Sequence, residues 1–262
     1  KAIRGKHELY TYIKDEDLDF TFYYQDLNWS FPAENFNARV YKGGTEINSF
    51  FAPSVTTEPQ EKRIQLTGLG EGAYRIILDN SDDIIITKIA TKQHLLVAKD
   101  KLYLANNEIY QSTIKDLTIS PSQIATNSNE LLFKTDHESG LQTIKINDED
   151  FSVNEISSFI AWQPDDYAVG SEKTLLIPKN DLLIMGHGYF AFAPDSFFDP
   201  DYQIDVLQSY ADIEQYDYLI AKDSSYVYYS KALQITDSKD FSQRRPAILF
   251  DIALLYNDAY NY

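Results

Sequence analysis

The sequence contains no cysteine and only one methionine. The absence of cysteine excludes disulfide bonds, thiolate metal ligands and a cysteine nucleophile. A chain of 262 residues can bury a sizeable core without such cross-links. The cysteine count is therefore compatible with a reducing or an oxidising compartment.

Long apolar runs are also missing. The densest runs, Ile84–Ile86 and Leu182–Met185, are far shorter than the roughly 18 residues that a membrane-spanning helix needs. The chain begins at Lys1 without a methionine. Any membrane attachment is therefore expected only through a segment outside this chain.

Positive charge is scarce, because 23 basic residues stand against 40 acidic ones and give a formal net charge of −17. Such a field repels nucleic-acid phosphates and anionic lipid headgroups, so we expect neither as a partner. The charges are spread along the chain without a long block of one sign, which indicates a solvated surface.

The common catalytic motifs are absent. The glycine-rich stretch Gly68–Ala73 lacks the last glycine of a dinucleotide-binding loop and runs into a strand pattern. The stretch His7–Thr11 ends in threonine where a zinc protease has its second histidine. The four histidines are far apart in sequence: His7, His94, His137 and His187. We predict no catalytic residue; a hydrolase site assembled from distant residues stays a third interpretation.

Aromatic residues are abundant, with 20 tyrosines and 15 phenylalanines, and they favour β-strands. The stretch Asp17–Trp29 alternates with a period of two, which is typical of a half-buried strand. One parity holds its apolar residues: Leu18, Phe20, Phe22 and Tyr24.

Turn residues divide the rest of the chain into short strands. Leu131–Thr135 and Leu141–Ile146 are expected to be two strands joined by a hairpin loop, Asp136–Gly140. Lys99–Lys101 is expected to be a turn between two short strands. Two glycines flank His187, and this pattern predicts a β-bulge more readily than a binding loop.

These patterns predict an all-β protein made of two packed antiparallel β-sandwich, jelly-roll-like domains, with at most one or two short helices. The first domain is expected over residues 1–92 and the second over 93–262, with an irregular insertion at 194–217. One short helix could lie within Asp205–Tyr216, where apolar residues recur at near-helical spacing.

Two features could bind a ligand. Trp29 and Trp162 each lie at a strand end, where an exposed indole can stack on a sugar, although buried packing is the alternative. Calcium is the one metal to consider, because Asp199, Asp201 and Asp205 fall within seven residues. Ordinary use of aspartate in turns is the alternative there.

One stretch near the N-terminus is similar to known proteins. Arg4–Tyr12, RGKHELYTY, followed by Gln25–Trp29, QDLNW, resembles the opening of large, uncharacterised, predicted extracellular proteins of archaea and candidate-phylum bacteria. A softer similarity extends through Gly186–Phe192. The resemblance implies export and surface exposure and assigns no role to any residue. The order from Tyr10 to Ile89 also looks like small jelly-roll accessory modules of secreted proteins.

We therefore expect a non-catalytic structural or interaction protein that is extracellular or on a cell surface. Its expected partners are copies of itself or other cell-envelope proteins, with no cofactor other than calcium. The alternative is a pair of carbohydrate-binding modules, which would need Trp29 and Trp162 on an exposed flat or concave face.

Overall fold

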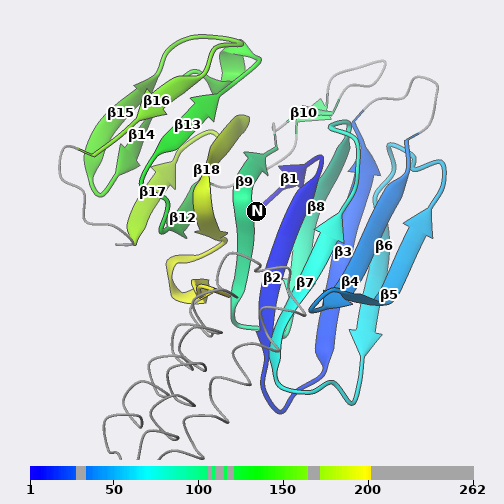
Figure 1. The fold of residues 1–262 in the computed structure, drawn as a ribbon. Helices are drawn as coiled ribbons and strands as arrows, with labels where there is room; N and C mark the ends of the chain where they lie inside the picture. The colour runs from blue at the N-terminus through cyan, green and yellow to red at the C-terminus, as the bar shows by residue number, and fades with distance from the viewer. Residues whose placement is uncertain (28–33, 106–107, 110–114, 117–120, 165–171, 202–262) are drawn as a thin grey trace, which may run out of the picture. The chain divides into compact units, whose positions relative to one another are not determined.

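The computed structural model describes residues 1–27, 34–105, 108–109, 115–116, 121–164 and 172–201 (Figure 1). Every strand pair of known register in these ranges is antiparallel. The helices there are two short 3-10 turns, η1 (Glu138–Gly140) and η2 (Pro194–Ser196). The prediction of an all-β, sandwich-like fold with one or two short helices is confirmed. No helix in the described ranges has the length and apolarity needed to cross a membrane.

The N-terminal strands form two ladders that face each other. One ladder runs through β6 (Gln60–Leu66), β3 (Leu18–Asp26), β8 (Ile84–Thr91) and β1 (Ile3–Arg4). The other runs through β5 (Thr45–Ala52), β4 (Phe36–Lys42), β7 (Gly72–Leu78) and β2 (His7–Ile13). The rings of Tyr24 on β3 and Phe36 on β4 stack at 4.1 Å, so the core of this sandwich lies between the two ladders.

The later strands repeat this arrangement. One ladder runs through β15 (Glu149–Val153), β14 (Gln142–Ile146), β17 (Lys173–Ile177) and β12 (Ser122–Thr126). A second, shorter ladder pairs β16 (Ile160–Trp162) with β13 (Leu131–Lys134). The ring centroids of Phe133 on β13 and Phe151 on β15 lie 5.2 Å apart, so these ladders also enclose apolar side chains. Two further short strands, β10 (Glu108–Ile109) and β11 (Lys115–Asp116), pair with each other.

Two long strands, β9 (Leu96–Leu104) and β18 (Leu182–Ala191), pair with each other and belong to both sandwiches. The edge of β9 that faces away from β18 pairs with β2 at one end and with β1 at the other. The edge of β18 that faces away from β9 pairs in the same way with β13 and then with β12. Each sandwich therefore splits into its two layers along this shared ladder.

The period-two pattern of the sequence correctly placed β3 and its buried face. Four residues of one parity are at most 4% exposed: Leu18, Phe20, Phe22 and Tyr24. Asp19 faces the other way and accepts hydrogen bonds from Arg63 Nε at 2.8 Å and Nη2 at 2.6 Å. Hydrogen bonding to Arg63 lowers the pKa of Asp19 to about 2.

Two sequence predictions about connections are wrong. Lys99–Lys101 is not a turn between strands, because β9 continues through it with Asp100 in the left-handed region (φ 57°). Asp136–Gly140 is not a hairpin loop, because β13 pairs with β16 and β18 whereas β14 pairs with β15 and β17. The loop instead joins the two ladders of the second sandwich. Sequence patterns indicate strands but do not fix which strands pair.

The predicted bulge at His187 is confirmed, because the β9–β18 register shifts between Met185 and Tyr189. A side chain at Gly186 would overlap Ser128, so the bulge needs a glycine where the backbones approach closely. His187 itself is exposed.

Of the described residues, those within 1–40 and 48–198 form one compact unit, and those within 41–47 and 199–201 are grouped in a second. β9, which begins just after the expected boundary at residue 92, pairs with β1 and β2 of the N-terminal part. That boundary stays a prediction. Most of the expected insertion at 194–217, including the helix expected within Asp205–Tyr216, lies outside the described residues.

Candidate functional site

Strands β13 and β16 present an apolar outer face. In β13, Leu131 and Phe133 are buried, so the alternation of the strand turns Leu132 and Lys134 outward. β16 pairs with β13 in a register that places the exposed Ala161 opposite Leu132. The outer surface of this ladder is therefore apolar where a solvated strand usually carries polar side chains.

One more large apolar residue extends this surface. Leu132 is 39% exposed and Phe159, two residues before Ala161 and of the same parity, is 53% exposed. Lys134 Nζ lies 5.9 Å from the ring centroid of Phe159. We call Leu132, Lys134, Phe159 and Ala161 the β13–β16 face. Ile156 is also exposed, but an isolated bridge pairs it with the buried Thr135, so it belongs to the other side of β13.

Sequence reasoning missed the β13–β16 face, although a signal was present. Leu131, Leu132 and Phe133 are apolar at three successive positions, whereas a strand with one buried face requires apolar residues only at alternate positions. The middle residue of such a run must point away from the core.

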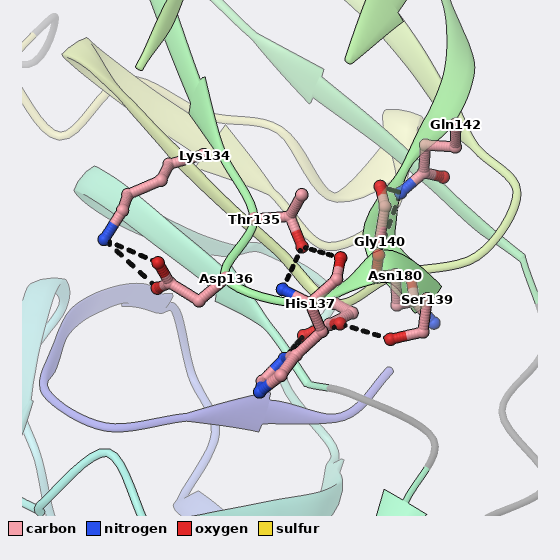
Figure 2. Close-up of polar contacts among 9 residues, drawn as sticks. Lys134, Thr135, Asp136, His137, Ser139, Gly140, Gln142 and Asn180 are labelled. Carbon is pink, nitrogen blue, oxygen red and sulfur yellow. Dashed lines mark hydrogen bonds and ion pairs between the residues drawn. The ribbon is translucent and has the colours of Figure 1, made fainter. Parts of the chain in front are cut away.

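A polar cluster lies beside this face, in the loop after β13 (Figure 2). The imidazole Nδ1 of His137 lies 3.1 and 3.2 Å from the two carboxylate oxygens of Asp181. The hydroxyl of Ser139 donates to the same carboxylate at 2.7 Å. The Asp181 side chain is 2% exposed and that of His137 is 36% exposed, so a buried acid orients a histidine that solvent can reach.

The turn that carries Asp181 has an unusual backbone. Asn180 and Asp181 both have positive φ, 59° and 50°, which only glycine, asparagine and aspartate adopt readily. Side-chain bonds hold this turn: Ser122 Oγ donates to Asn180 Oδ1 at 2.7 Å, and Gln142 Nε2 donates to the Asn180 carbonyl at 2.9 Å. A side chain on Gly140 would lie 2.5 Å from the Asp181 carbonyl oxygen. The loop and the turn therefore pack tightly.

The arrangement of Ser139, His137 and Asp181 differs from that of a nucleophilic triad. In a triad the serine hydroxyl is directed to the imidazole, but the Ser139 proton is directed to Asp181. The contacts fasten the loop after β13 to the turn before β18. The sequence held no signal for this cluster, because His137 and Asp181 are 44 residues apart and match no motif.

The predicted carbohydrate-stacking residues are placed only in part. Trp162 lies at the end of β16 opposite Leu131, is partly buried and packs against the hydrophobic core. Trp29 lies outside the described residues. Sugar stacking by these tryptophans stays a prediction.

The predicted calcium loop is also described in part. Asp199 Oδ1 accepts the backbone N–H of Asp201 at 2.8 Å, which gives Asp199 a role in the turn. Asp205 lies outside the described residues. In the part of the chain that the structure describes, no group of three or more histidines and acids is arranged to hold a metal ion.

Calcium binding at Asp199, Asp201 and Asp205 is testable by thermal melting. If the loop binds calcium with a dissociation constant near 1 mM, 10 mM calcium should stabilise the protein by about 1.4 kcal/mol relative to chelator. Magnesium at the same concentration is the control for ionic strength. Equal midpoints in calcium, magnesium and chelator would mean that the aspartates serve the turn only.

No protein-family model and no curated protein matches this chain. Among solved structures, it is similar to the M60 catalytic domain with the CBM51-1 and CBM51-2 domains from Clostridium perfringens ZmpB, at 7% identity and a TM-score of 0.23. The match covers 72% of this chain and 34% of that one, so the chain spans about a third of that structure. A TM-score of this size carries no argument about fold or function.

Proposed function

We propose that this chain is a non-catalytic structural or interaction protein of a cell surface or a secreted assembly. Its partner, a second copy or another envelope protein, binds the β13–β16 face. The observation that supports this proposal is that Leu132, Ala161 and Phe159 lie exposed on the same side of one small ladder. Contiguous exposed apolar side chains of this kind are typical of interaction surfaces.

The composition of this face resembles the centre of an interface. Leucine, phenylalanine and alanine make up its apolar part, and Lys134 pairs with Asp136 at 2.9 Å on its border. Apolar centres with charged borders are common in protein interfaces. The ammonium group of Lys134 near the Phe159 ring adds a cation–π contact.

The net charge of −17 sets a condition for self-association. Two copies repel each other at low ionic strength, and the Debye length falls from about 30 Å at 0.01 M salt to about 8 Å at 0.15 M. Association of copies should therefore strengthen as salt is added. A basic envelope partner would show the opposite dependence.

Analytical ultracentrifugation tests this proposal. At about 0.15–0.5 M salt, where charge repulsion is screened, the average mass of the wild type should rise with protein concentration, and Phe159→Ser together with Leu132→Ser should abolish the rise. Phe51→Ser is the matched control, because Phe51 is 58% exposed on β5 and lies outside the β13–β16 face. A wild type that stays monomeric, or a loss that Phe51→Ser reproduces, would rule out self-association through this face.

Two alternatives make different predictions. If the chain is a carbohydrate-binding module, a glycan array should give signals that Trp29→Ala or Trp162→Ala removes. If it is a hydrolase, a broad substrate panel should give turnover that His137→Ala removes, since His137 is the histidine oriented by a buried acid. Reproducible turnover of this kind would overturn the non-catalytic proposal.

A further inference from the structure

Along the outer edges of β9 and β18, one partner strand ends and another begins, and we call each of these places a split. At each split a side chain, in place of a partner strand, accepts a backbone hydrogen bond. On β9, the pairs Ile3↔Leu104 and Leu9↔Ala98 mark where β1 ends and β2 takes over. In this gap the backbone N–H of Tyr103 donates to Nε2 of His7 at 3.0 Å. An imidazole therefore takes the place of a backbone carbonyl.

The split on β18 is built in the same way. Its edge pairs with β13 up to Met185 and with β12 from Phe190. In between, the backbone N–H of Tyr189 donates to Asn127 Oδ1 at 2.8 Å. The two splits thus use equivalent hydrogen bonds, but only a histidine can gain a proton near neutral pH.

His7 is held in one tautomer. Because Nε2 accepts the Tyr103 N–H, the ring proton must be on Nδ1, which lies 3.3 Å from the carbonyl oxygen of Gly5. His7 is 4% exposed. Gly5 has a φ of 76°, and a side chain there would overlap the Asp82 carboxylate. The ring therefore joins the tight β1–β2 turn to β9.

The surroundings of His7 oppose its protonation. Burial and, to a lesser extent, the positive charge of Lys101 on β9 lower the pKa of His7 to about 3. Lys6 of the turn is paired with Asp79, which follows β7, at 2.8 Å. Two further charged side chains lie at this turn: Arg4 on β1, 4.8 Å above the ring of Tyr103 on β9, and Asp82 in the loop before β8, beside Gly5.

We propose that His7 is a proton-operated switch at the first split of the ladder. Protonation converts Nε2 from an acceptor to a donor that faces the Tyr103 N–H, so the β1–β2 turn separates from β9 in acid. The split held by Asn127 stays closed, because its amide does not titrate.

The direction of the effect follows from proton binding. In the unfolded chain His7 has its ordinary pKa of 6.5, and in the folded chain its pKa is about 3. Below pH 6.5 the unfolded or opened state binds a proton that the closed state does not, so stability is lost as the pH falls. Between pH 7 and pH 5, His7 alone should raise the opening equilibrium constant about 25-fold.

Denaturant unfolding at pH 7, 6 and 5 tests the switch. The ratio of the unfolding equilibrium constant at pH 5 to that at pH 7 should be about 25-fold smaller for His7→Gln than for wild type. The glutamine oxygen can accept the Tyr103 N–H, but the amide does not titrate. His187→Gln is the matched control, since His187 is exposed. Identical pH dependence of wild type and His7→Gln would refute the proposal.

Amide hydrogen exchange of the wild type gives a second test that needs no variant. When exchange is run at pH 7, 6 and 5 and each rate is divided by the intrinsic exchange rate of the unprotected amide at that pH, the Tyr103 amide should lose protection at pH 5 while the Tyr189 amide keeps it. Loss of protection at both amides together would indicate global unfolding rather than opening at His7.

Discussion

Replacing Phe36 by alanine is expected to lower the free energy of unfolding by about 3–5 kcal/mol, the usual cost of removing a buried aromatic ring. Phe36 is fully buried. Its ring lies 4.1 Å from that of Tyr24, 5.9 Å from Phe22 and 6.0 Å from Phe50, measured between centroids. The cavity would therefore open between the two ladders of the first sandwich.

Phe51→Ala is the control for this prediction. Phe51 follows Phe50 on the same strand but is 58% exposed, so its loss should change the free energy of unfolding by no more than about 0.5 kcal/mol. Equilibrium denaturation in urea measures both variants. Equal costs for Phe36→Ala and Phe51→Ala would mean that the ring contacts of Phe36 do not stabilise the fold.

Replacing Asp181 by asparagine is expected to cost about 2–4 kcal/mol. The buried carboxylate accepts from both His137 and Ser139. An asparagine amide is neutral and offers one oxygen; with that oxygen at the Oδ2 position, its NH2 group would face the imidazole Nδ1 of His137, which lies 3.2 Å from Oδ1. Asparagine tolerates the left-handed backbone at this position as well as aspartate does, so the loss would report on the hydrogen bonds.

Asp136→Asn is the matched control, because the same chemical change is made in the same loop. The Asp136 side chain is 39% exposed and pairs with Lys134 at 2.9 Å, and exposed pairs of this kind contribute about 0–1 kcal/mol. Thermal and urea unfolding should separate the two variants clearly. A cost for Asp181→Asn no larger than that for Asp136→Asn would show that the buried cluster does not hold the loop.

The sequence was informative where the relevant pattern is local. Alternation along Leu18–Asp26 identified β3 and its buried face, because a strand that lies on a core exposes every second residue to it. The glycines around His187 indicated the bulge, because close backbone approach requires the absence of a side chain.

The sequence was uninformative where pairing partners decide the structure. Asp136–Gly140 looked like a hairpin loop, but its flanking strands pair elsewhere. Lys99–Lys101 looked like a turn because it is polar. These residues are in fact the middle of β9, between the part that pairs with β2 and the part that pairs with β1. The contact of His137 with Asp181 bridges 44 residues and arises only once those partners are set. The β13–β16 face likewise depends on which side of β13 the core occupies.

The shared ladder also determines how this molecule would carry mechanical load. β9 and β18 are antiparallel and paired at seven positions, from Leu182↔Leu104 to Ala191↔Val97. Tension applied between the two sandwiches is carried by these hydrogen bonds as well as by the covalent chain, and along the strands it loads many of the bonds in shear at once. The molecule would transmit force through folded structure, so stretching one molecule across the two sandwiches should yield an abrupt, all-or-none extension step rather than the gradual straightening of a linker.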